Sequence, residues 1–303
     1  MRYVSPTLLA ALISCAMLSS SALAQHSIDV QRSAAEGSFF EALRLYEKMS
    51  KRKATVEAQI AAGNAAWGLG LPERAVREYD SALRSKELSA EERARVFLSR
   101  GILEYQEGRF QVAVLFAEKT IGKLPGPSPL RSKAWLLWGE SLSRLGSYGA
   151  AESKYLKALE EAKAEELPDI HYLLGKAQLR LGKTKEAQEN FEKIPLHHER
   201  TPHAIRELAA LAIESQSYEH AAFWLAKGRQ DYPNRFLDSW VDFALVQVAI
   251  HKDDRKEVER LQEKATKKYP PSDHWLTLLN AAVDVFRWKR VEENPAEASN
   301  GSN

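Results

Sequence analysis

The chain has 303 residues, of which 44% are hydrophobic and 28% are charged, and its formal net charge is +2 at pH 7. These proportions are ordinary for a soluble folded protein. Because the charge is nearly balanced, nothing in the composition favours nucleic acid or an anionic membrane surface as a partner.

Residues 1–24 have the layout of a targeting segment. Arg2 gives a positive end, residues 8–18 form an apolar run, and Ala22-Leu23-Ala24 precedes Gln25. The run is shorter than a transmembrane helix requires, and the small residues fit the cleavage rule for exported proteins. We predict a signal peptide over residues 1–24 and a mature protein in the periplasm of a Gram-negative bacterium.

The same segment admits a second interpretation, centred on Cys15. Leu12-Ile13-Ser14-Cys15 resembles a bacterial lipoprotein box, in which the cysteine is lipidated and becomes the mature N-terminus. A lipid chain there would tether the protein to a membrane. The apolar run continues past Cys15, which favours cleavage after Ala24. Since Cys15 is the only cysteine, that cleavage excludes disulfides and thiolate metal sites.

From residue 27 to residue 270 the chain repeats a helical hairpin about seven times. In its clearest copy, residues 132–163, apolar residues recur at spacings of three and four within 135–145 and again within 148–159, which predicts two amphipathic helices. Gly146 separates them, and glycine adopts the left-handed conformation that ends many helices. One such hairpin cannot bury its apolar faces alone, so neighbouring hairpins must stack.

Four positions mark the hairpins. A small residue recurs in the first helix: Gly63, Gly101, Gly139, Gly175, Ala209 and Val246. A turn residue follows it: Gly37, Gly70, Gly108, Gly146, Gly182, Gln216 and Asp253. A small residue recurs in the second helix: Ala42, Ala75, Ala113, Ala151, Ala187, Ala221 and Val258. Four residues later an aromatic side chain is common: Tyr46, Tyr79, Ala117, Tyr155, Phe191, Leu225 and Gln262. Successive copies are 33 to 38 residues apart.

This pattern, with prolines after several second helices (Pro125, Pro233 and Pro270), resembles the tetratricopeptide repeat (TPR) family. The resemblance covers nearly all of the mature chain and departs from a strict period of about 34 residues. It implies an all-α fold: a right-handed α-solenoid of about seven hairpins over residues 27–270, stabilised by contacts between neighbours.

Three connecting segments stand out. The basic run over residues 48–53 is interpreted as a solvated connection, with an anionic contact as the alternative. The proline-rich stretch 124–129 predicts a rigid elbow, because it cannot continue a helix; a domain boundary there is less favoured, because the repeat resumes at once. His197, His198 and His203 raise a metal hypothesis, but no carboxylate or cysteine completes a ligand set at recognisable spacing, and an exposed loop is favoured.

After the seventh hairpin the sequence predicts one more amphipathic helix, within residues 271–291, with Ser272 or Asp273 as its N-cap. A solenoid needs its last apolar face covered, so we interpret this helix as a cap rather than as a docking element. Its apolar side is formed by Trp275, Leu276, Leu279, Val283, Phe286 and Trp288. Residues 292–303 are polar and predicted to be disordered.

Sequence motifs for catalysis are missing. The glycines fall at repeat positions instead of in a phosphate-binding loop, and no nucleophile elbow, HExxH or cysteine-ligand motif occurs. We predict that the protein is not an enzyme and takes no cofactor. Trp67, Trp135, Trp138 and Trp224 lie on the helical stripes and are predicted to be core residues.

The family resemblance implies that first helices line a concave groove. The positions that match groove-facing positions are Asn64, Arg95, Ser99, Tyr105, Lys133, Glu140, Arg144, Tyr172, Lys176, Arg180, Arg206 and Gln247. Six of them are basic, so we hypothesise that the groove binds a protein or peptide segment that carries acidic groups; the alternative is that they only solvate the groove. The family's carboxylate clamp is not formed, because Asn64 follows Ile60 and Lys133 is followed by Leu137 at the required spacing.

These features predict a non-enzymatic protein-interaction scaffold of the bacterial cell envelope, which serves the assembly of an envelope complex. The alternative is an outer-membrane lipoprotein, lipidated at Cys15, that pilots or stabilises a secretion, pilus or outer-membrane component. Membrane contact is expected only in that alternative, and no nucleic-acid partner is expected in either. The oligomeric state stays open.

Overall fold

A computed structural model of the chain describes residues 25–49 and 54–293. It divides into two compact units, Met1–Lys163 (unit 1) and Ala164–Asn303 (unit 2), which are described separately. The predicted signal peptide with Cys15, residues 50–53 of the basic run and residues 294–303 of the predicted tail lie outside the described residues.

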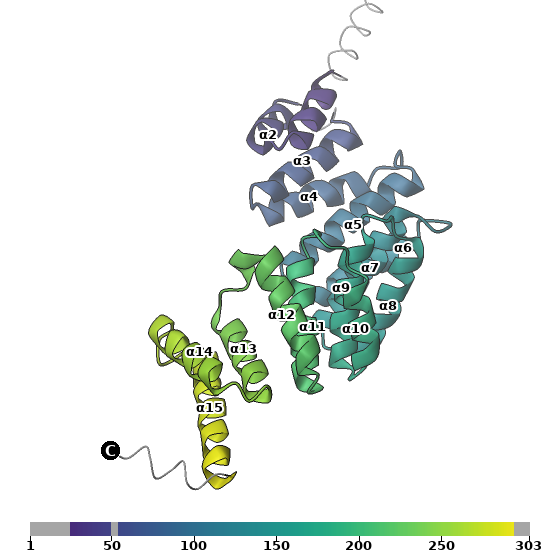
Figure 1. Cartoon of the computed structure of the whole chain (residues 1–303). Helices are drawn as coiled ribbons and strands as arrows, with labels where there is room; N and C mark the ends of the chain where they lie inside the picture. Colours follow the sequence, from purple (N-terminus) through teal and green to yellow (C-terminus); the bar gives the residue numbers. More distant parts are fainter. Residues whose placement is uncertain (1–24, 50–53, 294–303) are drawn as a thin grey trace, which may run out of the picture. The chain divides into compact units, whose positions relative to one another are not determined.

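Unit 1 contains four helical hairpins (Figure 1). The first pairs a helix over residues 25–35 with α2 (Phe39–Lys48), and the second pairs α3 (Val56–Gly68) with α4 (Pro72–Leu83). The third and fourth are α5 (Ala90–Gln106) with α6 (Phe110–Ile121), and α7 (Pro129–Arg144) with α8 (Tyr148–Glu161). First helices of successive hairpins also pack on one another, α3 on α5 and α5 on α7.

Unit 2 contains three hairpins and a final single helix. The hairpins are α9 (Leu167–Arg180) with α10 (Thr184–Glu192), α11 (Thr201–Glu214) with α12 (Tyr218–Asp231), and α13 (Ser239–His251) with α14 (Arg255–Lys268). A short 3₁₀ helix, η1 (Pro233–Arg235), follows α12, and α15 (His274–Glu293) ends the unit. The predicted all-α fold of stacked hairpins with a C-terminal helix is confirmed.

The turn between the two helices has the same backbone conformation in every hairpin. The predicted turn glycines Gly37, Gly70, Gly108, Gly146 and Gly182 all have φ between +70° and +78°. Gln216 and Asp253, the predicted replacements, have φ of +58° and +53°. The sequence therefore located all seven turns, including the two where a residue with a side chain adopts the left-handed conformation.

The small residue of the first helix makes room for an aromatic ring of the second. A Cβ atom added to Gly139 would lie 2.6 Å from Cε1 of Tyr155, and one added to Gly63 would lie 2.6 Å from Cε1 of Tyr79. These tyrosines are buried, with 1% and 0% of their surface exposed. The sequence suggested that the glycines let the helix backbones approach; the structure shows that the space is filled by the ring.

Helix α15 caps the last hairpin with one of its faces. Asp273 is its N-cap, as one of the two predicted residues, and its Oδ1 accepts a hydrogen bond of 2.9 Å from the backbone N–H of Leu276. Leu276, Leu279 and Val283 are buried in a cluster with residues of α13 and α14. Trp288, predicted to be on the apolar side, is instead 59% exposed.

The proline-rich elbow lies inside unit 1, between α6 and α7, whereas the division into units falls after Lys163. Within residues 25–49 and 54–293, none of the helices is both long enough and apolar enough to cross a membrane.

Candidate functional site

All the predicted groove residues lie on first helices of hairpins. In unit 1 they are Asn64 on α3; Arg95, Ser99 and Tyr105 on α5; and Lys133, Glu140 and Arg144 on α7. In unit 2 they are Tyr172, Lys176 and Arg180 on α9; Arg206 on α11; and Gln247 on α13. Their distribution on one kind of helix agrees with the groove hypothesis, while their contacts show several different local roles.

Unit 1 has a pocket of about 330 Å³ lined by consecutive first helices. The helix over residues 25–35, α3 and α5 contribute, and the pocket brings together the predicted residues Asn64 and Arg95. Ile60 supplies apolar surface, and Glu57 and Glu92 add two carboxylates that the groove hypothesis did not include. The pocket is therefore of mixed charge and not uniformly basic.

Asn64 is held in place by the second helix of its own hairpin. The hydroxyl of Tyr79 donates a 2.6 Å hydrogen bond to Asn64 Oδ1. Burial raises the pKa of Tyr79, and the charge of Arg100 and a hydrogen bond with Ser99 oppose that rise. Asn64 of α3 and Ser99 of α5 thus both form a hydrogen bond with the buried hydroxyl of Tyr79.

Three further predicted residues meet at the junction of α5, α6 and α7. The ring of Tyr105 packs edge-on against Phe110, with centroids 5.4 Å apart, and the guanidinium of Arg144 lies 5.1 Å from the centroid of Phe110. Burial, reinforced by the negative charge of Glu140, raises the pKa of Tyr105, and Arg144 lowers it. Lys133 lies exposed nearer the start of α7.

In unit 2 the predicted residues of α9 differ in whether their side chains have partners within the chain. Lys176 Nζ donates a 2.7 Å hydrogen bond to Glu207 of α11. The ring centroids of Tyr172 and Phe191 lie 5.9 Å apart. Arg180 is exposed and has no ion pair or hydrogen bond with any residue that the structure describes. Gln247 of α13 is half-buried.

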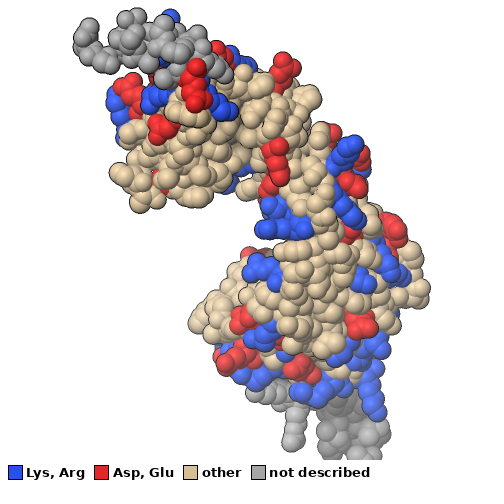
Figure 2. Space-filling model, turned by 90° about the horizontal axis from the view of Figure 1, so that it is seen from below, with Lys and Arg blue, Asp and Glu red and all other residues tan. Residues whose placement is uncertain are grey.

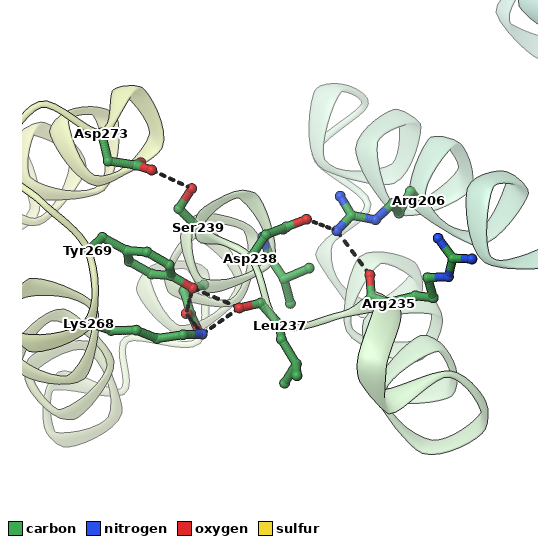
Figure 3. A network of polar contacts seen from close by, with 10 residues as sticks. Arg206, Arg235, Leu237, Asp238, Ser239, Lys268, Tyr269 and Asp273 are labelled. Carbon is green, nitrogen blue, oxygen red and sulfur yellow. Dashed lines mark hydrogen bonds and ion pairs between the residues drawn. The ribbon is translucent and has the colours of Figure 1, made fainter.

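A pocket of unit 2 surrounds Arg206 and measures about 430 Å³. Its lining residues come from the first helices α11, α13 and α15 and the segment before α13: Arg206, Glu207, Ala210, Asp238, Ser239, Trp240 and Trp275. Arg206 forms an ion pair with Asp238 and donates a 3.1 Å hydrogen bond to the carbonyl of Arg235 (Figure 3). Its guanidinium lies 4.9 Å from the ring centroid of Trp240.

A second set of polar contacts anchors the wall of this pocket. The hydroxyl of Tyr269 donates hydrogen bonds to Asp242 Oδ2, at 2.6 Å, and to the carbonyl of Leu237, at 3.0 Å. Lys268 donates to the same carbonyl, and Ser239 donates to Asp273 at 3.0 Å (Figure 3). Because Asp242 is only 4% exposed, these contacts fix the start of α13 against α14 and α15.

Three of the six predicted basic residues already have carboxylate partners. Arg95 pairs with Glu91 at 2.6 Å, Lys176 with Glu207 at 2.7 Å, and Arg206 with Asp238. Figure 2 shows Lys and Arg side chains interspersed with Asp and Glu side chains over the visible face. The electrostatic character of the first-helix surface is thus mixed, and three of the six predicted basic positions are already neutralised by acids of the chain itself.

Comparison with known proteins agrees with this architecture. The sequence profile described as Tetratricopeptide repeat matches residues 60–127 and 136–195. Residues 60–127 and 136–195 carry tetratricopeptide repeats. Among solved structures, Pseudomonas aeruginosa PilF superposes with a TM-score of 0.57 at 17% identity, over 71% of this chain and 93% of that one. YrrB, described as a TPR protein with an unusual peptide-binding site, superposes with a TM-score of 0.54 at 17% identity, over 67% of this chain and 97% of that one. No curated protein matches the chain.

Stacked helical repeats present extended concave binding surfaces, so the surfaces of the first helices are the place to look for a binding site. Among the four tryptophans predicted to be core residues, Trp135 is buried, whereas Trp67, Trp138 and Trp224 are half-buried. Trp135 is buried and stacks on Trp138 with centroids 5.5 Å apart, and Lys154 of α8 lies 4.1 Å from the centroid of Trp138.

The histidine-rich loop between the fifth and sixth TPR hairpins does not form a cluster. His197 has φ of +79° and donates its backbone N–H to the hydroxyl of Tyr232 at 3.0 Å. His198 Nδ1 accepts a hydrogen bond of 3.2 Å from the backbone of Arg200. Within the described ranges, no group of three or more His, Cys, Asp or Glu residues is placed to hold a metal ion.

Sequence reasoning missed Asp238, Ser239, Trp240 and Trp275 as lining residues of the Arg206 pocket. A signal was present, because partners across neighbouring first helices are separated by about one repeat. Arg206 and Asp238 are 32 residues apart, and Ser239 and Asp273 are 34 apart. A search for opposite charges at that offset would have found the pair of Arg206 and Asp238.

Proposed function

We propose that the protein is an interaction scaffold of the bacterial cell envelope, which binds a segment of a partner protein on the surfaces of its first helices. The observation that carries the proposal is that both units have a pocket lined by three consecutive first helices. Each pocket combines apolar surface with charged groups of both signs, the composition that orients a bound peptide rather than merely attracting it.

The partner segment that we propose is extended or helical and carries acidic groups. Arg180 supports this choice, since no residue of the described chain neutralises it, and Arg95 supports it because its partner Glu91 lies on the same exposed helix surface. An exposed ion pair of this kind is worth about 0.2–1 kcal/mol, so a partner carboxylate can replace Glu91 at small cost. Arg206 is a poorer choice, because its guanidinium also supports the backbone at Arg235.

The test compares charge reversals on first helices with charge reversals on second helices. We expect the double variant Arg95→Glu/Arg180→Glu to lose partner capture in crosslinking and pull-down from the native host. The matched variant Arg77→Glu/Lys185→Glu changes the same charge on exposed residues of the second helices α4 and α10, and should capture the partner normally. Both variants should unfold at the wild-type temperature. Equal capture by the two variants would show that the first-helix surfaces are not the binding site.

Glu57, which lines the unit 1 pocket, gives the opposite test. If the partner is acidic, Glu57→Lys should strengthen capture while Arg95→Glu weakens it, and both effects should fade as salt is raised. Strengthening by Arg95→Glu instead would assign a basic partner to this pocket.

The envelope location is supported by the sequence of residues 1–24, with its positive end, apolar run and small residues before Gln25. The alternative, a lipoprotein anchored through Cys15 that pilots or stabilises an outer-membrane component, rests on Leu12-Ile13-Ser14-Cys15. Mass spectrometry of the protein isolated from its native cells separates them. A chain that starts at Gln25 excludes the lipoprotein, a diacylated Cys15 excludes the soluble scaffold, and an intact Met1 excludes both.

A further inference from the structure

Helix α15 has two apolar faces, and the described chain covers only one. Leu276, Leu279 and Val283 are buried against α13 and α14. On the opposite side of the helix, Val285 and Trp288 are 52% and 59% exposed. A helix that is apolar on both sides is normally buried on both sides, so the outer face needs a cover.

The exposed residues of α15 are spaced for a helical partner. Leu278, Ala281, Val285 and Trp288 are all exposed, and they recur at intervals of three, four and three residues. This is the a/d spacing of a coiled coil, in which such residues form a seam between two helices. The four residues are called the outer seam below.

None of the other described residues of unit 2, 164–273, supplies that helix. α15 packs on α13 as α13 packs on α11, so it occupies the position of a first helix. The other first helices are covered by a second helix, whereas Figure 1 shows none beside the outer side of α15. The sequence beyond Glu293 is NPAEASNGSN, which contains no large apolar side chain to place on the seam.

The charges beside the outer seam favour a second copy of α15. With Leu278 and Val285 at a positions, Asp284 occupies a g position and Lys289 the following e position. In a parallel pair of helices, a g residue meets the next e residue of the partner helix. Asp284 of each copy would therefore face Lys289 of the other. An antiparallel pair would bring g to g and e to e, and would lose both contacts.

We propose that two copies of this chain associate through the outer seams of α15, side by side and parallel. The outer seam points away from α13 and α14, so the remainder of each unit 2 lies on the far side of its own α15 and does not obstruct the pair. This inference is independent of the partner-binding function proposed above, because no residue of the outer seam lines the pocket around Arg206.

The first test is the concentration dependence of molar mass, measured by sedimentation of the full chain. We expect a reversible monomer–dimer equilibrium that Val285→Glu weakens about a hundredfold, since each dimer would bury two unpaired carboxylates. Leu115→Glu introduces the same charge at a side chain of α6 with 53% exposure and serves as the control, with unchanged association. Circular dichroism should show wild-type helix content and melting for both variants.

The second test addresses orientation. Asp284→Lys and Lys289→Asp should each weaken the dimer, and the double variant should restore it. In a Cys15→Ser background, Val285→Cys should form a disulfide between two copies on mild oxidation, because equal a positions are neighbours in a parallel pair.

Three results would overturn the proposal. One is a chain that stays monomeric up to its solubility limit, with or without residues 1–24. Another is a dimer that Val285→Glu does not weaken. The third is a dimer that the double charge swap fails to restore and Val285→Cys fails to crosslink, which would exclude the parallel arrangement. A monomer whose seam is protected from hydrogen exchange only when residues 1–24 are present would identify that segment as the cover instead.

Discussion

Hairpin α7/α8 in unit 1 and hairpin α13/α14 in unit 2 both turn through a residue with positive φ, but their helices pack differently. In α7/α8, Gly139 leaves a space that the ring of Tyr155 fills, and the turn residue is Gly146. In α13/α14 the position of Gly139 is Val246, which is fully buried, and the turn residue is Asp253.

In three hairpins the glycine and the ring form a pair: Gly63 with Tyr79, Gly139 with Tyr155, and Gly175 with Phe191. In α5/α6, where Ala117 takes the place of the ring, Leu137 of α7 fills the space over Gly101 instead. Where the ring is replaced by Leu225 in unit 2, the facing residue is Ala209; where it is replaced by Gln262, the facing residue is Val246. Gln262 then donates a 2.9 Å hydrogen bond to Asn280 of α15 and so serves the terminal helix. The fold needs a filled interface between the two helices, and either a ring or aliphatic side chains can fill it.

The largest effect should come from removing the ring itself. Tyr155→Ala leaves a cavity over Gly139 and is expected to lower the free energy of unfolding by about 3–5 kcal/mol. Gln262→Ala, at the corresponding position of unit 2, removes the hydrogen bonds with Asn280 and Arg287 at a half-buried site and should cost about 1–2 kcal/mol. Urea titration followed by circular dichroism measures both. Equal losses would mean that the ring has no special role.

A smaller loss is expected when the space for the ring is reduced. Gly139→Ala places a Cβ atom 2.6 Å from Tyr155, and should cost about 1–3 kcal/mol through overpacking. The double variant Gly139→Ala/Tyr155→Leu reproduces the natural pair Ala209 and Leu225. Its loss of stability should be smaller than the sum of the losses in Gly139→Ala and Tyr155→Leu. A loss equal to that sum would refute the coupling.

Substitutions at the turn residues should change the free energy of unfolding by about 1 kcal/mol, downward in unit 1 and upward in unit 2. Gly146→Ala places a Cβ atom at a φ of +78°, which costs roughly 1–2 kcal/mol, because an L-residue disfavours this region. Gln216→Gly and Asp253→Gly relieve the same strain in unit 2 and should raise stability, although Asp253 also accepts a 2.7 Å hydrogen bond from Arg290. Gln216→Gly is therefore the cleaner measurement, and a loss of stability there would contradict the strain argument.

The hairpins and turns could be predicted because they depend on local spacing. Gln216 and Asp253 were located without any glycine, since the hairpin period continued through them. The packing role of Gly139 could be expected only in outline, because the partner ring is 16 residues away and its direction depends on how the two helices cross.

The charge of the candidate site could not be predicted from single positions. Lys176 and Arg206 each pair with an acid 31 or 32 residues away, on or just before the next first helix. Such pairs exist only because neighbouring hairpins stack in register. The division after Lys163 was not predicted either, because the proline-rich segment drew attention to residues 124–129 and the hairpin pattern is continuous across Lys163.

The smallest expected effect is a difference between the units in their response to mild acid. His171 Nδ1 lies 2.8 Å from Asn190 Oδ1; burial lowers the pKa of His171, the contact with Asn190 raises it, and Lys193 lowers it. Burial also lowers the pKa of His203, followed by the charges of Arg200, Arg235 and Arg206, with Glu207 opposing them. Unit 1 contains only His26.

A histidine with a lowered pKa in the folded state is protonated first in the unfolded chain. The stability that it supports is present above its unfolded pKa of about 6.5 and is lost as the pH falls through the folded pKa values. Unit 2 should therefore unfold at lower urea concentration when the pH is lowered from about 7.5 to 5.5, while unit 1 changes less. His171→Gln/His203→Gln should flatten this response, and His220→Gln, which changes an exposed histidine of α12, should not. Hydrogen exchange measured by mass spectrometry reports the two units separately, and an equal loss of protection in both would contradict the assignment to these two histidines.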